Sequence, residues 1–237
     1  YKKDDNASWW SRGSSTTPTT AKGINSFTWN LRYPGPTTFD GIIIWGASAK
    51  QGPKAPLGTY TVQMKVGPEV IKSYPFTIEM DPNLKGITAE DLQKQFELAS
   101  KITQKATIAN EAVIQIRDIR KQLDSLGKGI SNRQFKKLSE DFMGTLTQIE
   151  EDLYQTKNQS GQDPLNFPIK LNNRFNALQR SIENGDARPT DAAYVVYDEL
   201  SKELDQHMAK LNSTLKTQLP KVNVLLEKNG SGTIRLE

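Results

Sequence analysis

The spacing of apolar residues changes at Asp81-Pro82 and divides the chain into two parts. Before this point apolar and polar residues alternate and Gly, Pro and Thr are frequent, which is typical of β-strands. After it apolar residues recur every three or four positions, as they do in amphipathic helices. The sequence therefore predicts an α+β protein, with a β-sandwich in the first part and an antiparallel α-helical bundle in the second.

Short stretches of the first part have the composition of strands. The last two of them predict a hairpin that turns at Gly67-Pro68. The loops at 34–41 and 46–58 are long and contain Gly and Pro, which favours a sandwich with extended connections. The expected strands are residues 26–31, 42–45, 59–66 and 71–80.

Start and stop signals divide the second part into helices. Thr88 and Asp91 form a variant of the capping box and start the first helix, which Gly127 ends. Pro220 favours a short last helix over 220–228, and a terminal β-hairpin around Asn229-Gly230 is the alternative. The longer helices are expected at residues 88–126, 132–154, 169–183 and 190–218.

These patterns assign four regions to the chain. They are a linker or loop at 1–22, the β module at 23–82, the helical bundle at 87–228 and a C-terminal tail at 229–237. The first residue is Tyr and no signal-peptide pattern follows it, so we interpret the chain as a processed form or a fragment.

Composition and charge exclude several classes of function. The net charge is +4, from 31 basic and 27 acidic residues that are interleaved along the helices, which indicates solvated faces and no nucleic-acid partner. The absence of Cys excludes disulfides, thiolate metal sites and a Cys nucleophile. No apolar run approaches the roughly 20 residues of a membrane-spanning helix.

The sequence offers no catalytic, cofactor-binding or metal-binding set. His207 is the one His, and the acidic runs, such as Glu150-Glu151-Asp152, fall on helix faces open to water. A glycosidase instead needs two carboxyl groups that face each other across a cleft. Gly127–Gly129 lacks the spacing of a phosphate-binding loop. We therefore expect a protein that is not an enzyme and holds no cofactor.

Several motifs together resemble one bacterial family. The most specific are Trp-Asn-Leu-Arg-Tyr-Pro within Gly23–Pro34 and Pro-Leu-Gly-Thr-Tyr-Thr-Val within Ala55–Val62, and Asn110–Val113 and Leu219-Pro220 also fit. Over about residues 23–228 the chain is similar to the region that follows the propeller in proteins with a sortilin-type β-propeller. Such proteins are often labelled glycosyl hydrolase or photosystem II stability factor-like.

The resemblance implies an Ig-like β-sandwich module, similar to that of flagellar hook-capping proteins, followed by a helical domain. It also implies that one or more strands precede the Trp29–Arg32 segment, where this chain has only a short linker, so the sandwich is expected to be incomplete. The hydrolase label belongs to the propeller and does not carry over to any residue of this chain.

The candidate interaction residues are aromatic or basic. Aromatic side chains in strands usually form core or domain contacts, and a sugar-binding platform is the alternative. Arginine makes planar paired contacts with carboxylates, so an inter-domain clamp is the simplest role for Arg32 and for Arg117 with Arg120; anion binding is the alternative. The candidates are Trp9, Trp10, Arg32, Tyr33 and Trp45.

The function expected from these observations is binding or scaffolding. The chain would be a non-catalytic C-terminal region of a secreted, cell-surface or periplasmic bacterial protein. Its partner would be the upstream β-propeller region or another protein subunit, with a surface polysaccharide as a further candidate. The alternative is an accessory carbohydrate-binding module of a glycoside hydrolase, which a line of exposed aromatic residues on one sheet face would indicate.

Overall fold

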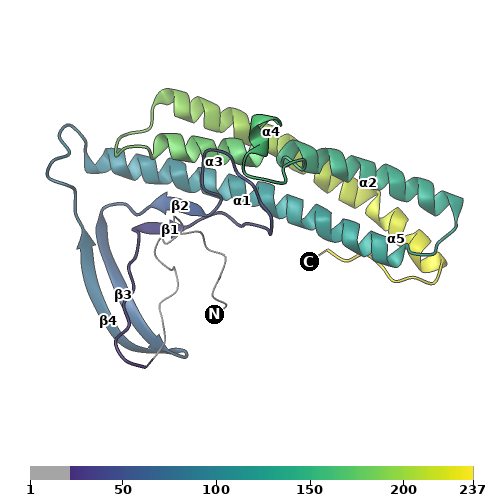
Figure 1. Cartoon of the computed structure of the whole chain (residues 1–237), viewed down its shortest axis with the longest axis horizontal. Helices are drawn as coiled ribbons and strands as arrows, with labels where there is room; N and C mark the ends of the chain where they lie inside the picture. Colours follow the sequence, from purple (N-terminus) through teal and green to yellow (C-terminus); the bar gives the residue numbers. More distant parts are fainter. Residues whose placement is uncertain (1–21, 237) are drawn as a thin grey trace.

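A long helical bundle dominates the structure, and a β-hairpin projects from one end of it (Figure 1). The computed structural model describes residues 22–236. The strands are β1 (Arg32–Pro34), β2 (Gln51–Lys54), β3 (Gly58–Val66) and β4 (Glu69–Ile78). The α-helices are α1 (Ala89–Leu126), α2 (Arg133–Leu153), α3 (Leu171–Ile182), α4 (Asp191–Thr217) and α5 (Leu219–Lys228), and a 3₁₀ turn, η2, covers Asp163–Leu165. The expected α+β class is confirmed.

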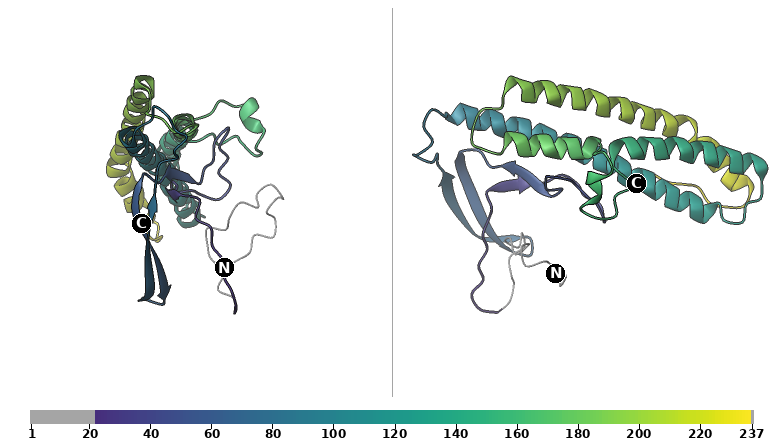
Figure 2. Two further views of the ribbon diagram at one scale, coloured as in Figure 1. Left: turned by 90° about the vertical axis from the view of Figure 1, so that its left-hand side faces the viewer. Right: turned by 45° about the horizontal axis from the view of Figure 1, so that its top comes forward.

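The helices form three parallel rods (Figures 1 and 2). The first rod is α1, whose 38 residues correspond to about 57 Å. Helices α2 and α3 follow one another along the second rod, in the direction opposite to α1, and α4 and α5 make up the third. The long first helix is therefore supported along its whole length, as a helix of that size requires.

The helix boundaries follow from the capping residues in the sequence. The Thr88 hydroxyl accepts a hydrogen bond from the Asp91 N–H, and the Asp91 carboxylate accepts one from the Thr88 N–H at 2.9 Å, so the capping box is confirmed. Asn132 and Thr190 cap α2 and α4 with a single bond each, accepted from the N–H of Phe135 and of Ala193. These bonds satisfy backbone donors that the first turn of a helix leaves without partners.

The C-terminus contains the short helix and not the alternative hairpin. After α5, the buried Ile234 exchanges two backbone hydrogen bonds with the side chain of Asn223. The Ser231 hydroxyl donates to the Leu126 carbonyl at the end of α1. The tail therefore packs back on the bundle.

The apolar stripes seen in the sequence form the core of the bundle. Their side chains are excluded from water where the three rods meet. Burial of this kind stabilises helices far more than intrinsic propensity does. Among the largest fully buried side chains are Ile102, Ile116, Phe142, Leu146, Phe175 and Leu204.

The strands form less than the expected sandwich. The described residues contain two separate two-stranded sheets, β1 with β2 and β3 with β4. The predicted hairpin is confirmed: β3 and β4 are antiparallel and turn at Gly67-Pro68, with a register shift between Met64 and Lys65.

Two of the predicted strands are wrong. Residues 26–31 end in a local turn, in which Leu31 has a φ of 56° and the Trp29 indole donates to the Arg32 carbonyl at 2.8 Å. Residues 42–45 run along the helices: the Ile43 N–H donates to the Tyr154 hydroxyl at the end of α2, and the Trp45 N–H donates to the Asn173 side chain in α3. In both cases the apolar pattern reflects packing on other elements.

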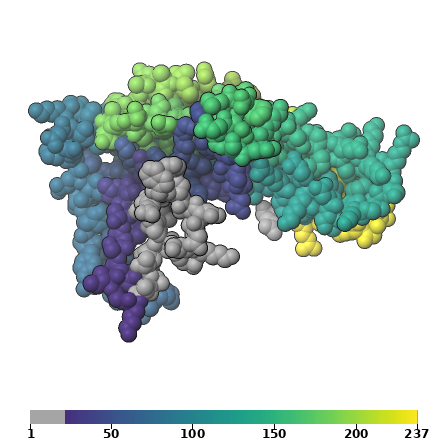
Figure 3. Space-filling view, viewed as in Figure 1, coloured from purple at the N-terminus to yellow at the C-terminus, as the bar shows by residue number. Residues whose placement is uncertain are grey.

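The segment between β1 and β2 packs on the helices. Pro36, Gly52 and Pro53 are buried, and Phe39 and Ile42 contact the apolar core of the bundle. Gly52 lies so close to β1 that any Cβ there would overlap the Tyr33 carbonyl. Residues 32–54 therefore belong physically to the helical body, whereas β3 and β4 project beyond it (Figure 3).

Candidate interaction surface

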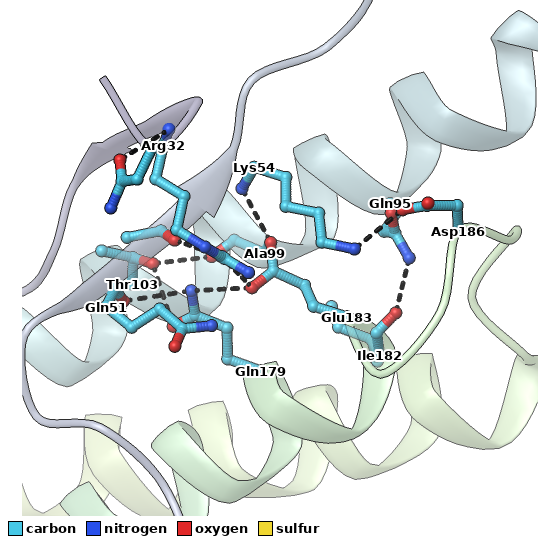
Figure 4. Close-up of polar contacts among 12 residues, drawn as sticks. Arg32, Gln51, Lys54, Gln95, Ala99, Thr103, Gln179, Ile182, Glu183 and Asp186 are labelled. Carbon is cyan, nitrogen blue, oxygen red and sulfur yellow. Dashed lines mark hydrogen bonds and ion pairs between the residues drawn. The ribbon is translucent and has the colours of Figure 1, made fainter. Parts of the chain in front are cut away.

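Glu183, at the end of α3, joins the short β1–β2 sheet to the helices. Its carboxylate accepts from Arg32 Nη1 at 2.8 Å and from the Lys54 backbone N–H at 2.8 Å. Its side chain is 1% exposed. Gln179, one turn earlier, donates to the Gln51 carbonyl (Figure 4). We call Arg32, Gln51, Lys54, Gln179 and Glu183 the polar junction.

Amide side chains of the helices hold the rest of the 37–54 segment. Asn173 accepts from the Trp45 N–H at 2.6 Å and donates to the Trp45 carbonyl at 3.0 Å. Asn110 donates to the Thr37 carbonyl at 2.7 Å. These contacts satisfy backbone groups that a neighbouring strand would otherwise pair, so the segment is fixed without a sheet.

A second buried carboxylate ties α1 to α2. Glu150 is 3% exposed and accepts from Arg117 Nε at 2.7 Å and Arg120 Nη2 at 2.8 Å. The Arg117 guanidinium also lies 4.6 Å from the centre of the Phe39 ring. The two arginines thus pair with a carboxylate, but these ion pairs join two helices of the bundle and are not the inter-domain clamp expected from the sequence.

The candidate residues from the sequence occupy different surroundings. Arg32 lies in the polar junction, as the clamp interpretation expects. Tyr33 packs its ring 5.1 Å from that of Phe96 in α1, and Trp45 is held through its backbone while its side chain stays 38% exposed. Trp9 and Trp10 lie outside the described residues.

A cavity of about 520 Å³ lies beside the polar junction, between residues 46–51 and the C-terminal half of α3. The guanidinium of Arg180 closes one side by donating to the Gly46 carbonyl. The lining contains one carboxylate, that of Glu183, which Arg32 already neutralises. The cavity therefore presents amide and hydroxyl groups to solvent and lacks the pair of facing carboxyls that glycoside hydrolysis uses.

Other titratable groups lie apart from this cavity. Within residues 22–236 no group of three or more His, Asp or Glu side chains is arranged to hold a metal ion. His207 lies 3.7 Å from the Asp152 carboxylate on the side of the bundle. The pKa of Asp91 is lowered to about 2, chiefly because the Thr88 hydroxyl and N–H bond its ionised form, with Arg188 adding to the effect.

The β3–β4 hairpin has one apolar and one polar face. The pairs Tyr60–Phe76 and Val62–Tyr74 lie on the same face, together with Met64. Near the helices Trp29 covers this face, with its ring 5.6 Å from that of Tyr60. Toward the tip the Lys72 ammonium lies 5.0 Å from the centre of the Tyr74 ring, and the face is otherwise open among the described residues: Val62, Met64 and Tyr74 are 56%, 55% and 55% exposed. We call these five hairpin residues the apolar face.

The sequence interpretation missed most of the polar junction. A signal for the junction was present in α3, where polar residues recur at helical spacing next to the apolar stripe. Four of these polar residues are buried: Asn172, Asn176, Gln179 and Glu183. Alternation does not show whether a second sheet covers a strand. An uncovered face was expected only from the resemblance, which implies an incomplete sandwich.

Comparison with known proteins adds no relationship. No protein-family model, curated protein or solved structure matches this chain. Among the helices of residues 22–236, none combines the length and apolar character that crossing a bilayer requires.

Proposed function

We propose that this chain is a non-catalytic association region, in which the helical bundle is the scaffold and the β3–β4 hairpin is the binding element. The observation that carries the proposal is the exposed apolar face. A two-stranded hairpin is marginally stable in water by itself, and contact with a further sheet or helix stabilises it. Val62, Met64 and Tyr74 are more than half exposed on a hairpin that projects from the bundle (Figure 3).

The proposed partner is another part of the parent protein or another protein subunit. The motif resemblance supports a β-propeller region upstream of this chain in a secreted, cell-surface or periplasmic bacterial protein. In this proposal the Ig-like sandwich forms when strands from the partner cover the apolar face. The bundle already buries its apolar side chains in one core and needs no such completion.

Hydrogen exchange tests the proposal. The chain is compared with the longer polypeptide that includes the upstream region, and residues 58–78 are expected to exchange at least about tenfold more slowly in the longer polypeptide. Helix α1 serves as the internal reference and should be equally protected in both samples. Equal exchange of the hairpin in both would contradict the association role.

A pair of variants assigns any protection to the apolar face. Val62→Glu places a charge on this face, whereas Ser73→Glu places it on the opposite, polar face of the hairpin, in β4. The first variant is expected to abolish the added protection of the hairpin, because an unpaired charge at an apolar contact is costly. The second should retain it.

The carbohydrate-binding alternative has weaker support. It requires several exposed aromatic rings along one sheet face, and the apolar face offers Tyr74 while Tyr60 and Phe76 stack together beneath Trp29. We also propose that the chain lacks hydrolase activity. Turnover of a chromogenic glycoside that is abolished by replacing one carboxylate of this chain would contradict that.

A further inference from the structure

The two outer edges of the hairpin differ, and the difference indicates where a further strand can attach. Polypeptide strands add to a sheet through backbone N–H and C=O groups that point away from the existing partner strand. Natural edge strands often block such addition with proline or charged side chains. This edge preference rests on the proposed association role of the hairpin and specifies how the hairpin would bind its partner.

Strand β4 carries these blocking features. Pro75 lies in the middle of the strand opposite Thr61, and Glu69 and Lys72 lie toward the tip. Proline has no N–H and takes positions whose nitrogen points away from the neighbouring strand. The outer edge of β4 therefore lacks a donor at its centre, which disfavours an added strand there.

The position of Pro75 also fixes which backbone groups of β3 point outward. In an antiparallel pair, residues that bond across the ladder alternate with residues whose backbone groups face away. Because the Thr61–Pro75 pair is of the second type, Thr59 and Gln63 share its outward orientation. Within residues 22–236 no backbone group donates to or accepts from these three outward positions.

The side chains of β3 leave this edge open. From Gly58 to Met64 the strand contains no charged residue and no proline, and it is rich in Thr, Tyr and Val. Lys65 is the first charge, at the register shift near the tip. An uncharged edge of this composition is suited to pair with an uncharged strand, since a charge on that strand would meet no opposite charge.

We propose that the outer edge of β3 accepts an added strand from a different polypeptide. That strand is uncharged over about seven residues, with apolar side chains at every second position on the side of Val62 and Met64. Pairing between two copies of β3 would place two apolar faces next to each other and leave both uncovered, so we assign the edge to a partner whose chain can continue across the face.

A blocked synthetic peptide tests this edge. The probe is the acetylated and amidated peptide Ser-Thr-Val-Thr-Val-Thr-Val-Thr-Ser, which is uncharged, differs from the sequence of β3 and supplies apolar side chains at every second position. Amide exchange of the full chain is measured by NMR with and without the peptide. The N–H groups of Thr59, Thr61 and Gln63 are expected to exchange about tenfold more slowly with peptide, whereas those of Ser73 and Thr77 in β4 should not change.

Matched proline variants separate the two edges. Gln63 and Ser73 are cross-strand partners, and both face outward by the same alternation. Gln63→Pro removes a donor from the β3 edge and is expected to abolish the peptide effect, whereas Ser73→Pro changes the β4 edge and should keep it. Retention of the β3–β4 ladder in each variant is verified from the amide shifts of Val62 and Tyr74.

Three results would overturn the proposal. Protection of Ser73 and Thr77, or of no hairpin amide, would show that β3 is not the accepting edge. Protection of the three β3 amides that rises with protein concentration alone would identify a second copy as the occupant. If the longer polypeptide protects the hairpin while the peptide fails, the edge assignment is wrong and the association role stands.

Discussion

At the scale of residues, two buried carboxylates fix the position of long segments. Glu183 holds β1 and β2 against α3, and Glu150 holds α2 against α1. A buried carboxylate is costly unless charged donors compensate it, and each of these has arginine as its partner. Such pairs add little net stability, but removal of one partner leaves the other charge buried and uncompensated, so replacing either carboxylate should be costly.

Replacing Glu183 tests the polar junction. Glu183→Gln removes the charge that Arg32 and the Lys54 N–H contact. The free energy of unfolding is expected to fall by about 2–4 kcal/mol, because the largely buried Arg32 guanidinium is left without a counter-charge. Chemical denaturation measures this. The control is Asp186→Asn, which removes a more exposed partner of Lys54 and should cost less than about 1 kcal/mol.

The titration of Asp91 tests the N-cap of α1. Its pKa of about 2 lies below the usual carboxyl value, so the folded state favours the ionised form. The stabilising effect is complete above about pH 4 and is lost as the pH falls toward 2. Side-chain NMR titration should reproduce the low pKa, and Thr88→Ala should raise it more than Arg188→Gln, because the Thr88 hydroxyl bond is the largest single cause of the low pKa; the Thr88 N–H bond stays in that variant. A larger effect from Arg188→Gln would contradict this order.

At the scale of elements, the sequence predicts what depends on local spacing and misses what depends on distant partners. The helices and the hairpin follow from periodicity, Thr88, Gly127 and Gly67-Pro68. The apolar run at 42–45 was mistaken for a strand because its backbone partners, Tyr154 and Asn173, lie more than 100 residues away. The clamp role of Arg32 could be expected from its chemistry, whereas its partner Glu183 could not.

Two deletions test which elements support the bundle. Replacing Gly58–Ile78 with a short Gly-Ser linker is feasible because Gly58 and Ile78 are cross-strand partners, and it should shift the melting temperature by no more than about 3 °C. The fragment 86–236 also loses residues 32–54, and with them the bonds that Glu183, Asn110 and Tyr154 make to that segment. It should keep helical circular dichroism but unfold at least about 3 kcal/mol more easily. Equal stability of the two would contradict the packing of residues 32–54 with the helices.

At the scale of the whole molecule, the structure combines a helical body that buries its own apolar core with a hairpin whose apolar face is largely uncovered. The three helical rods and residues 32–54 bury a continuous apolar core and compensate both buried carboxylates. In the hairpin, burial is largely confined to the end where Trp29 packs on Tyr60, and every residue from 61 to 75 is exposed. Figures 1 and 3 show it standing away from the bundle. This division of stability supports the proposal that the hairpin is completed by a partner.

Hydrogen exchange of the isolated chain measures that division most directly. Amides inside α1, α3 and α4 should open only with global unfolding, and the amide of Lys54 should be protected by its bond to the Glu183 carboxylate. The β3–β4 amides should exchange at least about a hundredfold faster than those of α1, because two strands with an uncovered apolar face open independently of the bundle. Protection of the hairpin equal to that of α1 would show that it is complete by itself, and this would contradict the account.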